Sequence, residues 1–205
     1  MYEKAVGVLE RILRADHPQI AASYSNIGSI QHELGNDELA LSWQKKALHI
    51  VGEVLGHSHP RPAKVYTNIA MVYSSQGEHR DALALTRKAL AIRAQVLGAD
   101  HPETMQSYYD VGVVHFSTGE YEEALKWHHK VLAARERVLG KEDPAVASMY
   151  INIGAVLDAQ GKQRKALAWF QKGLEARQRP LGADHPDTAV ARDWIEHVSQ
   201  SQPTR

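Results

Sequence analysis

The chain has 205 residues, 43% of them hydrophobic and 23% charged, and its 24 basic side chains balance 24 acidic ones. The balanced charge argues against a general nucleic-acid-binding protein, and the absence of cysteine excludes disulfides and thiolate chemistry. Because no apolar run approaches the roughly 18 residues of a membrane span and the N-terminus lacks a signal-peptide core, we expect a cytoplasmic or nuclear protein with neither membrane nor nucleic acid as partner.

A tripeptide recurs along the chain at a spacing of 42 residues, first as Asp16-His17-Pro18 and last as Asp184-His185-Pro186. Three further columns keep this spacing: Tyr24, Tyr66, Tyr108 and Tyr150; Gly35, Gly77, Gly119 and Gly161; Ala40, Ala82, Ala124 and Ala166. A fixed period of this length predicts structural repeats that stack on their neighbours. Because stacked repeats share a core across every joint, we expect one domain over residues 1–205.

In chain order, residues 1–15 align with the end of a repeat, so we expect them to form the second helix of a preceding partial repeat. This favours a fragment of a longer array, with an N-terminal cap as the alternative. Four full repeats follow, over residues 16–57, 58–99, 100–141 and 142–183. Residues 184–205 are expected to form a capping helix and a polar tail.

Each repeat is predicted to contain two helices. The first begins at the proline of the tripeptide, where a missing N–H costs nothing, and ends near a glycine that can adopt a left-handed conformation. The Asp or Ser two residues before the proline is expected to cap this helix, with Glu103 completing a capping box in the third repeat. The second helix is expected to span about residues 37–55 and its equivalents, with Pro180 ending the fourth one early, near Arg179.

An apolar stripe marks the buried face of each first helix, and one of its positions is always small. That position is occupied by Gly28, Ala70, Gly112 and Gly154. The small side chain indicates that the paired helices approach closely. A bulky column on the second helices, Trp43, Leu85, Trp127 and Trp169, is expected to pack between repeats, with partner contact as the alternative.

The order of Tyr, Gly or Ala, Gly and Ala in each unit resembles the tetratricopeptide repeat, and the phrase Leu97-Gly98-Ala99-Asp100-His101-Pro102 is similar to repeats of kinesin light chains. The resemblance covers nearly the whole chain. It implies an all-α fold, a right-handed superhelical solenoid of antiparallel helix pairs whose first helices line a concave groove. It also implies a scaffold that binds a linear peptide segment of a partner protein in that groove.

Ten residues of the first helices are candidates for peptide binding, because the register of the buried stripe turns them toward the implied groove. They are Asn26, Lys64, Thr67, Asn68, Met71, Tyr109, Asp110, Val113, Phe116 and Asn152. Ser25 and Ile151 share the register of Thr67 and are expected on the same surface. Lys64 is the one cation among the ten, which argues against a grip on a C-terminal carboxylate.

Within this set, asparagine recurs at one position of the repeat, as Asn26, Asn68 and Asn152. Related tetratricopeptide grooves hold a peptide main chain with asparagine at this place, and the alternative is a solvated column that links adjacent helices. Tyr109 and Phe116 predict a pocket for an apolar anchor in the third repeat.

Two alternatives to peptide binding stay open: self-association through the end helices, and a sensor or regulatory segment of a larger signalling or transport-adaptor protein. We expect no enzyme, because the chain carries no phosphate loop, nucleophile elbow or zinc-protease helix. The histidines of the His-Pro pairs are expected to cap helices. A weak metal site at His57 and His59 is the remaining alternative to a protein without metal or cofactor.

Overall fold

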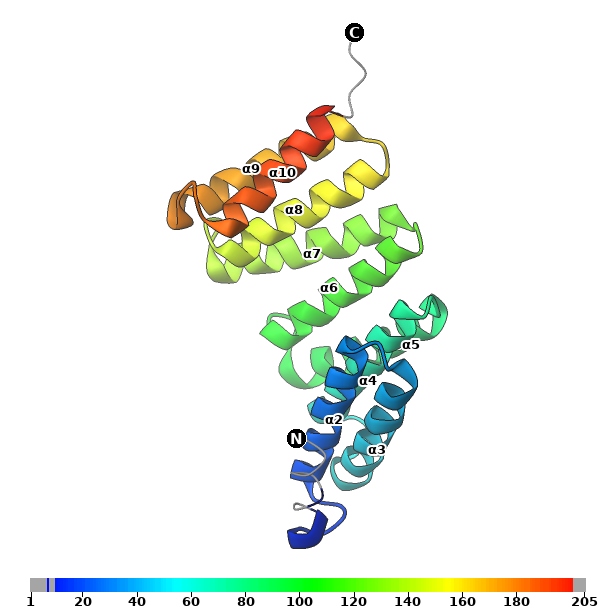
Figure 1. Ribbon diagram of the computed structural model, residues 1–205. Coiled ribbons are helices and arrows are strands. Elements are labelled where there is room, and N and C mark those ends of the chain that lie inside the picture. The colour runs from blue at the N-terminus through cyan, green and yellow to red at the C-terminus, as the bar shows by residue number, and fades with distance from the viewer. Residues whose placement is uncertain (1–6, 8–9, 201–205) are drawn as a thin grey trace. The chain divides into compact units, whose positions relative to one another are not determined.

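The computed structural model describes residue 7 and residues 10–200, and all regular structure in these residues is helical (Figure 1). The first helices of the repeats are α2 (Pro18–Glu33), α4 (Pro60–Ser75), α6 (Pro102–Ser117), α8 (Pro144–Ala159) and α10 (Pro186–Gln200). The second helices are α3 (Asp37–Leu55), α5 (His79–Leu97), α7 (Tyr121–Leu139) and α9 (Gln163–Leu181). The predicted all-α solenoid of antiparallel helix pairs is thereby confirmed.

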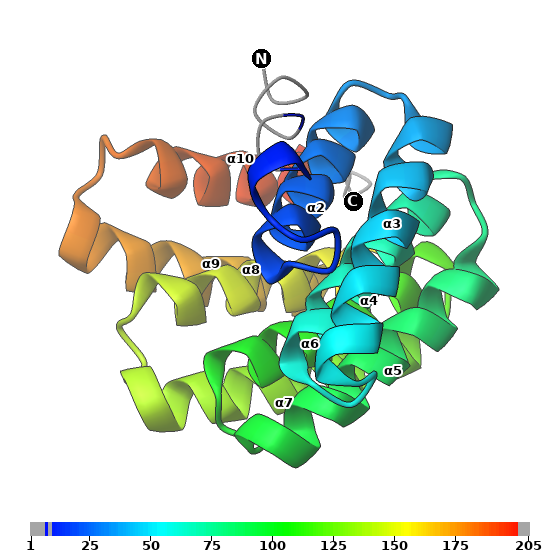
Figure 2. The same cartoon turned by 90° about the horizontal axis from the view of Figure 1, so that it is seen from below.

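The helices group into two compact units, Met1–Ser107 and Tyr108–Arg205. In the first unit α2 packs on α3, α3 on α4 and α4 on α5. In the second unit α7 packs on α8, α8 on α9 and α9 on α10, and Figures 1 and 2 show these helices side by side. The expectation of a single domain with the stated repeat bounds stays a prediction.

The two ends of the chain lie partly outside the described residues. Of the helix expected over residues 1–15, residues 1–6, 8 and 9 are not described, whereas residues 10–12 are helical. The tail after Gln200 is also outside the described part. No helix of the described residues has both the length and the apolar character required to cross a bilayer.

The first helices begin at the predicted prolines, and the prediction that the histidines of the His-Pro pairs cap them is confirmed. The Nδ1 atoms of His17, His59, His101 and His185 each accept a hydrogen bond from the backbone N–H two residues later, at 3.1–3.2 Å. Asp143, which replaces the histidine in the fourth repeat, accepts the same bond at 2.7 Å. The prediction that the Asp or Ser before the histidine provides this cap is therefore wrong, because the residue adjacent to the proline occupies the N-cap position.

Each first helix closes on a glycine with a positive φ angle, as predicted, and the glycine after each second helix also has a positive φ. Gly35 ends α2 with φ 78°, and Gly56 ends α3 with the same value. The expected early stop at Pro180 is wrong: α9 continues to Leu181 with the proline in its last turn. Pro180 has no N–H to donate to the preceding turn, but the Gly182 N–H still reaches the Gln178 carbonyl at 3.0 Å.

The small column allows large side chains of the second helices to enter the hairpin interface. A Cβ atom on Gly112 would lie 2.7 Å from His128 Cε1, and a Cβ on Gly154 would lie 2.6 Å from Phe170 Cε1. In the second repeat the pair at these positions is Ala70 and the smaller Thr86, both buried. The expected close approach of the paired helices is thus confirmed, and the sizes of the two side chains vary together.

The bulky column packs within its own hairpin and, as predicted, also between repeats, since the Trp169 ring lies 5.4 Å from His129 of the preceding repeat. The Trp43 ring lies 5.3 Å from Tyr24, and the Trp127 ring lies 5.8 Å from Tyr108. A lysine covers these rings, with Lys130 Nζ 4.0 Å from the centre of Tyr108. Packing accounts for these tryptophans, and the repeated ring–lysine clusters stabilise each hairpin.

Candidate functional site

In the first unit, three of the five predicted site residues are exposed on α2 and α4. They are Asn26, Lys64 and Met71, whose side chain is 55% exposed. Met71 offers an apolar contact to a partner, and Asn26 and Lys64 offer polar ones.

Asn68 is half-buried and links two helices. Its Nδ2 donates to Ser25 Oγ at 3.0 Å, and Ser25 Oγ in turn donates to Gln44 Oε1 at 3.0 Å. This contact is the helix-linking role that stood as the alternative to peptide binding for this residue. Ser25 itself is 7% exposed, because Gln44 of α3 covers most of it.

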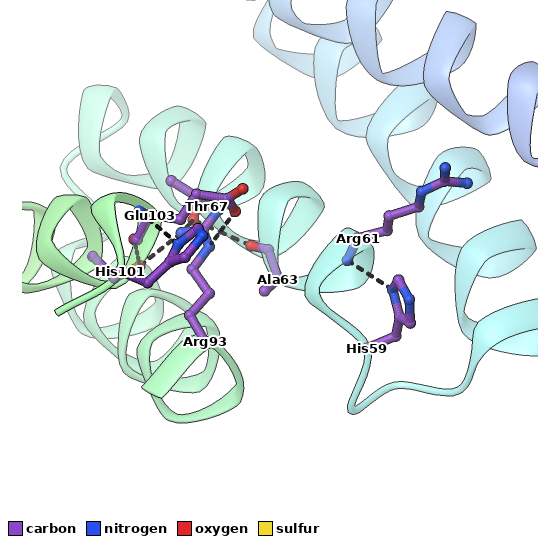
Figure 3. Close-up of polar contacts among 8 residues, drawn as sticks. His59, Arg61, Ala63, Thr67, Arg93, His101 and Glu103 are labelled. Atoms are coloured by element: carbon purple, nitrogen blue, oxygen red, sulfur yellow. Dashed lines mark hydrogen bonds and ion pairs between the residues drawn. The ribbon is translucent and has the colours of Figure 1, made fainter. Parts of the chain in front are cut away.

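Thr67 belongs to a second polar network, which joins α4 to the start of α6 through Arg93 of α5. Arg93 Nη1 donates to Thr67 Oγ1 at 3.2 Å and to Ser107 Oγ at 2.6 Å, and its Nε lies 3.3 Å from Glu103 (Figure 3). The Arg93 side chain is buried. Glu103 thus contributes an ion pair to this network.

In the second unit the predicted site residues lie on α6 and α8. Tyr109 packs its ring 5.4 Å from His128 and shares a side-chain hydrogen bond with Asn152. Burial raises the pKa of Tyr109, and the Asp110 carboxylate adds to this effect. Ile151 is buried, so its expected place on the partner surface is wrong.

The predicted apolar anchor of the third repeat is only partly open. Phe116 is 36% exposed and lies 5.8 Å from the Tyr121 ring, whereas Val113 and Tyr109 are half-buried. The structure therefore leaves Phe116 as the most accessible apolar group of the predicted set in this unit.

A column of arginines on the second helices was missed by the sequence analysis. Arg93, Arg135 and Arg177 are 42 residues apart, so the repeat spacing itself carried the signal. Arg135 Nη1 donates to the Ala145 carbonyl at 3.1 Å, and Arg177 Nη1 donates to the Asp187 carbonyl at 2.6 Å. Burial lowers the pKa of Arg135. Each arginine ties a second helix to the first helix of the next repeat.

The first repeat has Val51 at the arginine position, and a cavity of about 490 Å³ lies there between α2 and α4. Its lining residues are His17, Pro18, Gln19, Ala21, Ala22, Ser25, Asn26, Val51, Arg61, Lys64 and Val65. The site therefore joins two of the predicted residues, Asn26 and Lys64, to a largely apolar interior. A cavity of this size falls in the range of ligand sites.

The residues described show no cluster of three histidine, aspartate or glutamate side chains suited to a metal ion. His57 Nδ1 lies 3.2 Å from the Tyr66 hydroxyl, while His59 Nδ1 accepts the capping bond from Arg61. These two histidines, the weak metal candidate, thus have separate partners.

Solved structures with the same fold include three informative cases. A protein from Podospora anserina, named as a kinesin light chain with nearly identical TPR-like repeats, is 20% identical with a TM-score of 0.78 over 90% of this chain and 87% of its own. BtubC (BKLC) from P. vanneervenii is 25% identical with a TM-score of 0.77 over 90% of this chain and 73% of its own. Aspartyl phosphate phosphatase F from Bacillus subtilis is 17% identical with a TM-score of 0.79, and the alignment covers 97% of this chain but 52% of the phosphatase.

None of the curated proteins matches the chain in sequence. The family model for the tetratricopeptide repeat, in contrast, matches residues 1–53, 33–95, 61–125 and 103–179. These overlapping matches together cover residues 1–179, which is most of the chain. The chain therefore belongs to the tetratricopeptide repeat family.

Proposed function

We propose that the chain is a cytoplasmic adaptor that binds a linear segment of a partner protein on the exposed surfaces of its first helices. Proteins built from these repeats generally bind other proteins. The observation that carries the proposal is the cavity between α2 and α4, whose lining includes the exposed side chains of Asn26 and Lys64. An apolar hollow with a few polar groups at its edge is the usual form of a recognition site.

Exposed apolar side chains on the first helices support the same assignment. Met71 stands on α4 of the first unit, and Phe116 stands on α6 of the second. First helices that carry exposed apolar groups as well as amide and ammonium groups suit an extended peptide, which presents side chains and main-chain hydrogen bonds together. Self-association through the end helices and a regulatory role within a larger protein stay predictions.

The test is a random peptide display screen of the purified chain beside two double variants. Met71→Ser with Phe116→Ser removes one exposed apolar group from a first helix in each unit. Leu39→Ser with Val138→Ser is the matched control, because these side chains are each 52% exposed but stand on second helices.

We expect the parent and the control to enrich one peptide motif and the first variant to lose it. Circular dichroism confirms that all three proteins keep their helix content. Failure of the parent to enrich any motif, or equal loss of binding in both variants, would contradict the proposal.

A further inference from the structure

We call the contact between two successive repeats a joint. The first joint, between the first and second repeats, differs chemically from the second joint, between the second and third repeats. At the second joint, Arg93 enters between α4 and α6 and is held by Thr67, Ser107 and Glu103. Counting back 42 residues, the first joint has Val51 in place of the arginine, Val65 in place of Ser107 and Arg61 in place of Glu103. The first joint therefore lacks both the buried arginine of the second joint and the glutamate that pairs with it.

These exchanges leave space and reverse the charge at its edge. Val51 is too short to bridge the two helices, so the cavity of about 490 Å³ remains open between them. None of the described residues that line it is acidic, whereas Arg61 and Lys64 are cationic. Both of these side chains are exposed, and neither makes a hydrogen bond or ion pair with another described residue through its charged group.

We propose that this cavity receives an apolar side chain of the bound segment while Arg61 and Lys64 hold a carboxylate next to it. This inference rests on the proposed function and names its chemistry. The interior of Ala21, Val51 and Val65 matches an apolar group, and the two cations without acidic partners complement a negative one. The exposed amide of Asn26 lies at the same cavity and can bond the segment's main chain.

The sharpest variant is Val51→Arg, which gives the first joint the side chain that the other joints carry. The arginine fills the cavity and adds a positive charge. The variant therefore distinguishes binding that requires an empty cavity from binding that requires only positive charge. If the cavity holds the apolar side chain, peptides selected by the parent should bind this variant at least about tenfold more weakly despite the extra cation. Simple charge attraction would strengthen binding instead.

Ala22→Phe fills the same cavity from an exposed position of α2 and provides a second test if Val51→Arg fails to fold. Arg61→Gln with Lys64→Gln tests the carboxylate. Its matched control is Lys45→Gln with Arg87→Gln, which removes two exposed cations from second helices of the same unit.

The probes are fluorescent copies of the selected peptide, one with its acidic residue and one with the corresponding amide, measured by polarisation at low and high salt. We expect the Arg61 and Lys64 variant to bind the acidic peptide about three- to tenfold more weakly and the amide peptide as the parent does. The control variant should match the parent for both peptides.

Unchanged binding to Val51→Arg and Ala22→Phe, or equal affinity of the parent for the acid and the amide, would overturn this inference. Binding that depends on Met71 and Phe116 but not on the cavity would overturn it while sustaining the proposed function. Tight binding of N-acetylleucine alone would show a small-molecule site and would also overturn it. Absence of any peptide binding would overturn both proposals.

Discussion

At the scale of single residues, the hairpin interface depends on matched sizes at two positions. Gly112 faces His128 and Gly154 faces Phe170, whereas the second repeat has Ala70 with Thr86. A methyl group therefore fits only where the opposing side chain is short. The volume near the helix crossing is fixed, so a larger side chain at one position of the pair requires a smaller one at the other.

Gly112→Ala should lower the free energy of unfolding by about 1–3 kcal/mol, because its Cβ would lie 2.7 Å from His128 Cε1. Adding His128→Thr recreates the pair of the second repeat and should recover most of this loss. Urea denaturation of the two single variants and the double variant measures the coupling. Losses that simply add would mean that the two positions do not share space.

His128 should also make stability depend on pH. Burial, with a smaller contribution from His129, lowers the pKa of His128 from 6.5 to about 4. The unfolded chain therefore takes up a proton at this residue at a pH where the folded chain does not. Stability should fall as pH decreases from about 6.5 to about 4, by up to about 3 kcal/mol from this residue.

The measurement compares urea denaturation of the parent and His128→Gln between pH 4 and pH 8. Glutamine cannot titrate, and it recreates the Gln44–Gly28 pair of the first repeat. The variant should lose less stability than the parent on acidification. Parallel curves would show that His128 does not titrate as its burial implies.

At the scale of helices, most helix ends follow from the local sequence, and the end of α9 does not. Proline and glycine restrict or extend backbone conformation by themselves, so the starts at Pro60 and Pro102 and the end at Gly35 were predictable. The end of α9 was not, because helical hydrogen bonding after Pro180 continues to Gly182.

The candidate site was predictable only in part, for a related reason. Helical register placed Asn26, Lys64 and Met71 on the exposed surface correctly. It could not show that Asn68 bonds to Ser25 or that Arg93 reaches the next repeat, because these contacts join residues of different helices. The cavity at Val51 likewise becomes visible only when the joints are compared in space.

The caps give a direct prediction at this scale. His59→Ala should lower the free energy of unfolding by about 0.5–2 kcal/mol, since the Arg61 N–H would lose its acceptor. His59→Asp should retain or raise stability, as a carboxylate at a helix N-terminus also favours the dipole. Thermal unfolding of both variants tests this expectation.

Ser58→Ala provides the control for the cap, because the histidine and not the serine accepts the bond from Arg61. Its melting temperature should match that of the parent. A loss as large as that of His59→Ala would restore the original assignment of the cap to the residue before the histidine.

At the scale of the whole molecule, stability in a repeat protein is a sum of hairpins and of the joints between them. In the second unit, an arginine and a pair of aromatic rings hold the last helix, α10, to its neighbours. Arg177 of α9 donates to the Asp187 carbonyl of α10 and to Ser148 Oγ of α8, and the Phe170 ring stacks 5.3 Å from Trp194. The buried guanidinium therefore joins three helices.

Arg177→Met should detach α10 preferentially, because it removes the hydrogen bonds of the joint but leaves the α8–α9 hairpin packed. Hydrogen bonds to a charged group contribute about 1.5–3 kcal/mol, so amide exchange in α10 should accelerate by roughly ten- to a hundredfold while exchange in α8 changes less. Arg179→Met is the matched control, since the Arg179 side chain is 70% exposed and pairs with an equally exposed Glu142. It should leave the exchange rates of α10 nearly unchanged. Equal acceleration of exchange in α8 and α10 would mean instead that the second unit unfolds as one cooperative body. Arg177 would then not control the attachment of α10 separately from the rest of the unit.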